Sequence, residues 1–141
     1  MKIAIIDGQG GGIGKNLTEK IRQELGDKIE IIALGTNALA TSAMLKAGAN
    51  DGASGENAIV QNVKNVQIIV GTISILVANS MLGELTPAMA KAIGESPALK
   101  IILPINRSNI EIIGVKGEPL PHHVEQLVAR LKQLIVGENN V

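Results

Sequence analysis

Residues 3–15 combine an apolar run with a cluster of glycines, five of which lie between Gly8 and Gly14. A helical pattern begins directly after the cluster. Glycine lets the backbone adopt positive φ and lets an anion approach the N–H groups, and the N-terminus of the next helix favours negative charge. One glycine would suffice for a tight turn between a strand and a helix. The additional glycines therefore predict a binding site for a phosphate group, such as that of a nucleotide.

Two dinucleotide-binding templates can be compared with this turn. The pattern G-x-G-x-x-G fits Gly8 and Gly10, but Ile13 stands at its third glycine. The spacing G-x-x-x-G-I-G fits fully, with Gly12 and Gly14 completing it. This spacing resembles the turn of the short-chain dehydrogenases/reductases, which implies a Rossmann domain that binds NAD(P). The Tyr-x-x-x-Lys catalytic pair of that family has no counterpart, because the chain contains no tyrosine.

The P-loop pattern G-x-x-x-x-G-K-[ST] matches less well. It fits Gly14 and Lys15, but Gln9 replaces its first glycine and Asn16 replaces the hydroxyl that ligates Mg²⁺. The sequence Gly-Gly-Ile-Gly-Lys also resembles the deviant Walker loops of ParA-like ATPases. However, no later strand is expected to end in the Walker-B aspartate. ATP binding therefore ranks third among the hypotheses.

A further resemblance covers nearly the whole chain. Five segments resemble a family of small bacterial proteins known only as a domain of unknown function: Asp7–Lys15, Leu34–Ala38, Met44–Ala49, Gly55–Ile59 and Ala78–Glu84. That family is regarded as Rossmann-like. The resemblance implies the fold and brings no activity with it.

Short apolar runs alternate with helical patterns, which predicts a parallel sheet covered by helices on both faces. The expected strands are Lys2–Asp7, Ile29–Leu34, Val66–Val70, Leu99–Leu103 and Ile110–Val115. The expected helices are Ile13–Leu25, Ala38–Ala47, Glu56–Val63, Ile73–Leu82, Ala88–Ile93 and His122–Val136, with a polar loop at 48–55. The short link before the last strand should make it antiparallel, at an edge. We therefore predict one α/β domain over residues 1–141, a three-layer Rossmann-like fold of about five strands, mostly parallel with an antiparallel edge strand.

Ligands of open α/β sheets bind at the carboxyl ends of the strands. NAD enzymes usually have a carboxylate after the second strand, whereas Thr36 and Asn37 are neutral and so favour NADP over NAD. Asn37 is equally well explained as a helix cap, and Asp7 is expected to brace the glycine turn. The predicted cofactor-binding residues are Gly8, Gln9, Gly10, Gly11, Gly12, Ile13, Gly14, Thr36, Asn37, Gly71 and Thr72, with Lys15 and Arg107 as candidate anion contacts.

Composition excludes several classes of function. The 141 residues include no cysteine and no aromatic side chain, which excludes disulfides, thiolate metal sites and aromatic stacking platforms for single-stranded nucleic acid. Thirteen basic residues balance thirteen acidic ones, so nucleic acid and anionic membranes exert no general attraction. His122 and His123 point about 100° apart on a helix, so we expect no metal. We expect a cytoplasmic protein.

Two hypotheses of function follow. The first is a homodimeric Rossmann-like protein that binds NAD(P), with NADP favoured, or another phosphate-bearing small molecule. It includes a small reductase, although no catalytic residues can be identified. The second is a non-catalytic regulatory or assembly protein in which a nucleotide or phosphate controls association, motivated by the apolar segment Ile73–Leu82.

Overall fold

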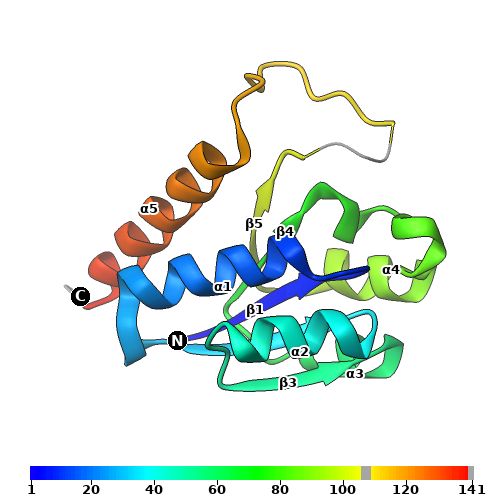
Figure 1. The fold of residues 1–141 in the computed structure, drawn as a ribbon, viewed down its shortest axis with the longest axis horizontal. Helices are drawn as coiled ribbons and strands as arrows, with labels where there is room; N and C mark the ends of the chain where they lie inside the picture. Colours follow the sequence, from blue (N-terminus) through cyan, green and yellow to red (C-terminus); the bar gives the residue numbers. More distant parts are fainter. Residues whose placement is uncertain (106–108, 140–141) are drawn as a thin grey trace.

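A five-stranded parallel sheet with the order β3-β2-β1-β4-β5 lies at the centre of the structure (Figure 1). The computed structural model describes residues 1–105 and 109–139. The strands are β1 (Lys2–Asp7), β2 (Glu30–Gly35), β3 (Asp51–Ser54), β4 (Ile68–Thr72) and β5 (Leu99–Leu103), and every pair is parallel. This order is that of Rossmann-like α/β folds, and its topological switch point lies between β1 and β4.

Helices cover both faces of the sheet, as expected. One face carries α1 (Gly12–Leu25), α2 (Ala38–Lys46) and α5 (Leu120–Asn139), and the other carries α3 (Glu56–Asn62) and α4 (Pro87–Glu95). Three short 3₁₀ turns complete the described elements: η1 (Gly26–Lys28), η2 (Ile73–Leu76) and η3 (Met81–Gly83). Of the helices in the described residues, none has the length and apolar character needed to cross a membrane.

Strand β1 is buried on both faces because helices pack against each of them. Ile3 and Ile5 contribute to the core beneath α1 and α5, and Ile6 contributes to the core beneath α3 and α4. None of the three is more than 1% exposed. Successive strand side chains point to opposite faces, so a strand between two helical layers must be apolar throughout. Between Lys2 at its start and Asp7 at the carboxyl edge of the sheet, the strand is entirely apolar.

The prediction of a polar loop at residues 48–55 is wrong, because Asp51–Ser54 forms strand β3 beside β2. The strand is short and largely exposed, so it needs no apolar pattern, and its backbone pairing leaves no signal in the sequence. The hydroxyl of Thr41 on α2 holds this edge. Its Oγ1 accepts from the Gly35 N–H at 3.1 Å and lies 2.7 Å from Ser54 Oγ.

The predicted antiparallel edge strand at Ile110–Val115 is also wrong. None of these residues belongs to a strand of the described sheet, and Ile113 is 91% exposed. Asn109 and Gly114 adopt positive φ of 54° and 93°, which interrupts an extended conformation on either side of the apolar residues. In Figure 1 residues 109–119, yellow to orange, lie away from the sheet and lead into α5.

Residues Ile73–Leu82 do not form the predicted apolar helix. After η2 the backbone becomes left-handed at Asn79, Met81 and Leu82, with φ of 66°, 57° and 56°. Such conformations cannot continue a right-handed helix. Residues Asn79–Glu84 instead form a tight loop, here called the Glu84 loop, which is closed by the hydrogen bond from the Asn79 N–H to the Leu85 carbonyl at 2.7 Å.

The Thr41 contacts yield a first prediction. Thr41→Val should lower the free energy of unfolding by about 1–3 kcal/mol, because the buried Gly35 N–H loses its acceptor. Thr41→Ser keeps the hydroxyl and is the matched control. Urea denaturation measures both variants, and equal stability of Thr41→Val and the wild type would show that the hydroxyl does not hold β3.

Candidate functional site

A crevice of about 500 Å³ opens at the carboxyl ends of β1 and β4. Its position is the switch point at which ligands of open α/β sheets bind. Its volume falls within the range of about 300–1,000 Å³ that is usual for small-molecule sites. The lining residues come from the glycine turn, from the segments after β4 and β5, and from the Glu84 loop: Asp7–Ile13, Thr72, Ser74, Met81, Leu82 and Ile105.

Three glycines of the turn are required by the fold itself. A Cβ on Gly8 would lie 2.5 Å from Thr36 Oγ1, and one on Gly14 would lie 2.6 Å from Met44 Sδ. Gly11 has a φ of +73°, and its Cβ would lie 2.7 Å from a backbone atom of α2. Packing alone therefore explains these three positions.

The other two glycines of the turn have no such explanation. A Cβ on Gly10 or Gly12 would meet nothing within 4 Å, and neither residue has positive φ. Both line the crevice. Within the described part of the chain, the N–H groups of Gly10, Gly12 and Ile13 make no hydrogen bond. Bare backbone with free donors is the surface that an anion can approach most closely.

Asp7 braces the turn, as the sequence predicted. Its Oδ1 accepts the Gly8 N–H at 2.8 Å and its Oδ2 accepts the Gly14 N–H at 2.7 Å. The carboxylate thereby joins the end of β1 to the first turn of α1. Asp7 thus occupies the Gly14 donor, whereas Gly12 and Ile13 line the crevice with N–H groups that bond to no described residue.

Thr72 also lines the crevice. The residue is 6% exposed, and its hydroxyl makes no hydrogen bond with any described residue. Among the described residues no fully buried side-chain polar atom lacks a hydrogen-bond partner, so this hydroxyl is accessible from the crevice. A polar group of a ligand can bond to it there.

Glu84 joins the glycine turn to the end of β2. Its Oε1 accepts hydrogen bonds from the Gln9 N–H at 2.9 Å, from Thr36 Oγ1 at 2.7 Å and from Asn37 Nδ2 at 2.7 Å. These bonds, led by that of Gln9, hold the pKa of Glu84 below its ordinary value of 4.5. The carboxylate is therefore ionised at neutral pH. Asn37 Oδ1 also accepts the Ala40 N–H at 2.8 Å, which confirms that Asn37 caps α2.

The predicted site residues thus separate into groups. Those from Gly8 to Ile13, together with Thr72, line one crevice. Thr36 and Asn37 are bonded to Glu84 and do not line it. Gly71 is buried in β4, and Lys15 is exposed on α1 without lining the crevice. Arg107 lies outside the described residues.

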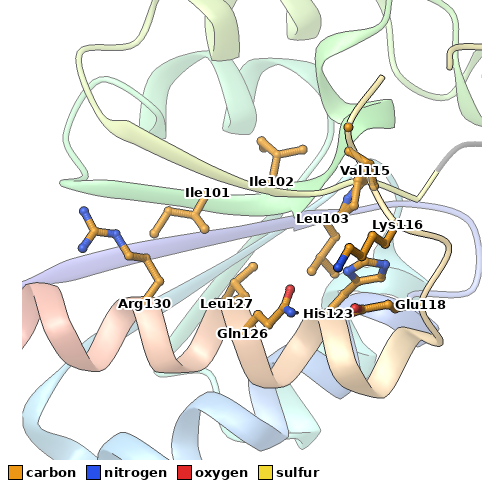
Figure 2. Close-up of a pocket in the computed structure, with 12 residues that line it drawn as sticks. Ile101, Ile102, Leu103, Val115, Lys116, Glu118, His123, Gln126, Leu127 and Arg130 are labelled. Carbon is orange, nitrogen blue, oxygen red and sulfur yellow. Dashed lines mark hydrogen bonds between the residues drawn. The ribbon is translucent and has the colours of Figure 1, made fainter. Parts of the chain in front are cut away.

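A second cavity, of about 520 Å³, lies between β5 and α5 (Figure 2). Figure 2 shows Lys116, Glu118 and His123 near one end of it and Arg130 near the other, with apolar Ile101 between them. A third cavity, of about 460 Å³, also includes His123 and shares Ile13 and Ile105 with the crevice. No group of three possible metal ligands occurs among the described residues.

The sequence does not identify Glu84, Leu82 or Ile105 as part of the site. It predicts that the polar residues of Ala78–Glu84 lie on or after an apolar helix. The left-handed backbone that carries Glu84 to the glycine turn leaves no recognisable pattern. The sequence favours a position at the start of a helix for His122 and His123 over a metal site, and it does not predict that His123 lines a cavity.

The parallel sheet, its strand order and the crevice at the switch point define a Rossmann-like α/β protein. A family model described as "Domain of unknown function (DUF3842)" matches residues 2–136, so the chain belongs to this family. This confirms the resemblance that covers nearly the whole chain. Comparisons with curated proteins and with solved structures gave no significant match. The family description names no activity, so the function must be argued from the site.

The glycines of the turn should respond differently to alanine. Gly8→Ala and Gly14→Ala should each lower the free energy of unfolding by about 1–3 kcal/mol, because the added methyl overpacks the fold. Gly10→Ala and Gly12→Ala face open space and should stay within about 0.5 kcal/mol of the wild type. Chemical denaturation measures all four, and a cost at Gly10 as large as that at Gly14 would contradict the division.

The lowered pKa of Glu84 predicts a dependence of stability on pH. The folded protein stabilises the ionised carboxylate relative to the protonated carboxyl. The contribution of Glu84 to the free energy of unfolding is therefore fully present above the ordinary pKa of 4.5, and it is lost as the pH falls through the lower pKa of the folded state. The wild type should therefore be more stable than Glu84→Gln at neutral pH, and this advantage should shrink as the pH falls below 4.5. Thermal unfolding over a pH series tests this, and an advantage that grows on acidification would refute it.

Proposed function

We propose that the crevice binds a nucleotide through its phosphate groups and that NAD(P) is the ligand class. The observation that carries this proposal is the pair Gly10 and Gly12, two glycines that the fold does not need, beside three free N–H groups. A phosphate on Gly10, Gly12 and Ile13 would accept these hydrogen bonds at the positive end of the α1 dipole. The fully matched G-x-x-x-G-I-G spacing favours a dinucleotide.

The other walls of the crevice suit the remainder of such a ligand. Ile13, Leu82 and Ile105 offer apolar surface for a flat ring, and the Thr72 hydroxyl can hydrogen-bond an amide substituent. A small reductase would hold its substrate in the adjoining cavity lined by His123. ATP ranks lower, because Asn16 replaces the Mg²⁺-binding hydroxyl and β4 ends in Gly71 and Thr72, without an acid.

The preference for NADP rested on the neutral residues Thr36 and Asn37. Glu84 brings an ionised carboxylate against both of them. A 2′-phosphate at this position would meet a like charge, so we do not carry the preference for NADP into the proposal.

A second candidate function is ligand-controlled assembly without catalysis. The observation that favours it is Leu82, which is 96% exposed while lining the crevice. A second copy of the chain that covers Leu82 would bury this side chain and respond to the occupant of the crevice. This candidate also accounts for the expected homodimer.

Ligand titration monitored by thermal unfolding tests the first proposal. NAD, NADH, NADP, NADPH, ATP and FMN are compared, and a ligand at 100 times its Kd should stabilise the protein by about 2.7 kcal/mol. Gly10→Ala and Gly12→Ala should weaken the effective dinucleotide by about tenfold or more, which is about 1.4 kcal/mol of binding free energy. Gly94→Ala, whose added methyl on α4 also meets nothing within 4 Å, is the control. The absence of a shift with every dinucleotide would overturn the proposal.

Light scattering after gel filtration tests the second. The wild type is expected to be a dimer at micromolar concentration, and Leu82→Asp should shift it to monomer. Leu39→Asp replaces another leucine, 67% exposed on α2, and should leave the dimer intact. A monomeric wild type, with and without ligand, would contradict the assembly function.

A further inference from the structure

Glu84 occupies the place that dinucleotide-binding folds give to an acidic residue at the end of the second strand. In those folds the acid hydrogen-bonds the ribose hydroxyls of NAD. Here β2 is followed by the neutral Thr36 and Asn37, and the carboxylate of Glu84 lies 2.7 Å from a polar atom of each. The acid therefore comes from the loop after β4 rather than from β2.

We propose that Glu84 recognises the ribose of the bound nucleotide by accepting hydrogen bonds from its 2′- and 3′-hydroxyls. The site then takes NAD(H) and discriminates against NADP(H), whose ribose carries a 2′-phosphate. This inference rests on the proposed dinucleotide-binding function and names the ligand within that class.

The carboxylate of Glu84 can accept further hydrogen bonds from the two hydroxyls of a ribose. All three of its hydrogen bonds end on Oε1, and Oε2 accepts none from the described residues. An ionised carboxylate offers about four lone-pair positions, so Oε2 can accept from two neighbouring hydroxyls. Glu84 is half-buried, which leaves the group accessible to a ligand.

The order of groups along the turn matches a ribose 5′-phosphate. The Gln9 N–H donates to Glu84, and the next N–H, that of Gly10, is free and lines the crevice. Gln9 lines the crevice and Glu84 does not, so the carboxylate approaches the crevice at the residue that precedes the phosphate donors.

The charge of Glu84 supplies the discrimination. Its partners Gln9, Thr36 and Asn37 are all neutral, and none of the ion pairs among the described residues includes Glu84. Its negative charge is thus not offset by a paired cation. A 2′-phosphate adds further negative charge at the same place, and like charges at short range repel.

The backbone of the Glu84 loop is consistent with a role in aiming the carboxylate. Met81 and Leu82 adopt left-handed conformations, which are costly for residues other than glycine and occur disproportionately at functional sites. Leu82 is almost fully exposed, so this strain does not serve to bury its side chain. Met81 packs close to Gly8, and the Glu84 N–H donates to the Met81 carbonyl at 3.1 Å, which fixes Glu84 beside the turn.

Isothermal titration of NADH and NADPH into the wild type and into Glu84→Gln tests the inference. The wild type should bind NADH at least tenfold more tightly than NADPH. Glu84→Gln keeps an acceptor for the three donors but loses the charge, so it should reduce this ratio to about threefold or less. Glu84→Asp keeps the charge and should retain a preference for NADH. Glu95→Gln, at the exposed end of α4, is the control and should leave the ratio unchanged.

Each outcome decides between the two proposals. If NADPH binds the wild type as tightly as NADH, or if Glu84→Gln leaves the ratio unchanged, Glu84 does not read the ribose, although the proposed function stands. If neither dinucleotide binds the wild type, both proposals fail. Because the measured quantity is a ratio within one variant, a general loss of stability in Glu84→Gln does not imitate the expected result.

Discussion

The carboxylate of Asp7 holds together the parts on which the candidate site depends. It ends the central strand and accepts the N–H groups of Gly8 and Gly14, one before and one after the glycine turn. Hydrogen bonds to a charged group contribute about 1.5–3 kcal/mol each, more than those between neutral groups. These two bonds join the end of β1 to the first turn of α1, and the core packing of Leu17 and Ile21 holds the rest of the helix on the sheet.

The sheet could be predicted from the sequence wherever burial demands apolar residues. Runs such as Ile3–Ile6 and Ile68–Val70 are apolar because helices cover both faces of the strand, so the pattern and the structure have the same cause. The edge strand β3 could not be found in this way, since Asp-Gly-Ala-Ser is held by backbone pairing and by Thr41. Ile110–Val115 shows the converse error, because its apolar residues suit a strand and yet no strand of the described sheet includes them.

The residues of the candidate site also differ in whether the sequence could predict them. The glycine turn is a local feature, so its residues and their order could be read directly from the chain. The contact between Gln9 and Glu84 spans 75 residues and depends on left-handed backbone at Met81 and Leu82. No periodicity marks such a turn, and the apolar residues around it imitate a helix. Glu84, on which the proposed preference for NAD(H) rests, is therefore the residue that sequence reasoning could not place.

The two kinds of glycine in the turn also bear on how the family can diverge. Gly8, Gly11 and Gly14 are constrained by neighbouring atoms of the protein, whereas Gly10 and Gly12 face open space. Substitution of any of the first three would disturb the fold in any member of the family. Under the proposed function, the other two are constrained only by the ligand. A family member that did not bind the ligand would thus keep three glycines and be free to carry other residues at the remaining two, so the turn separates the constraints of folding from those of binding.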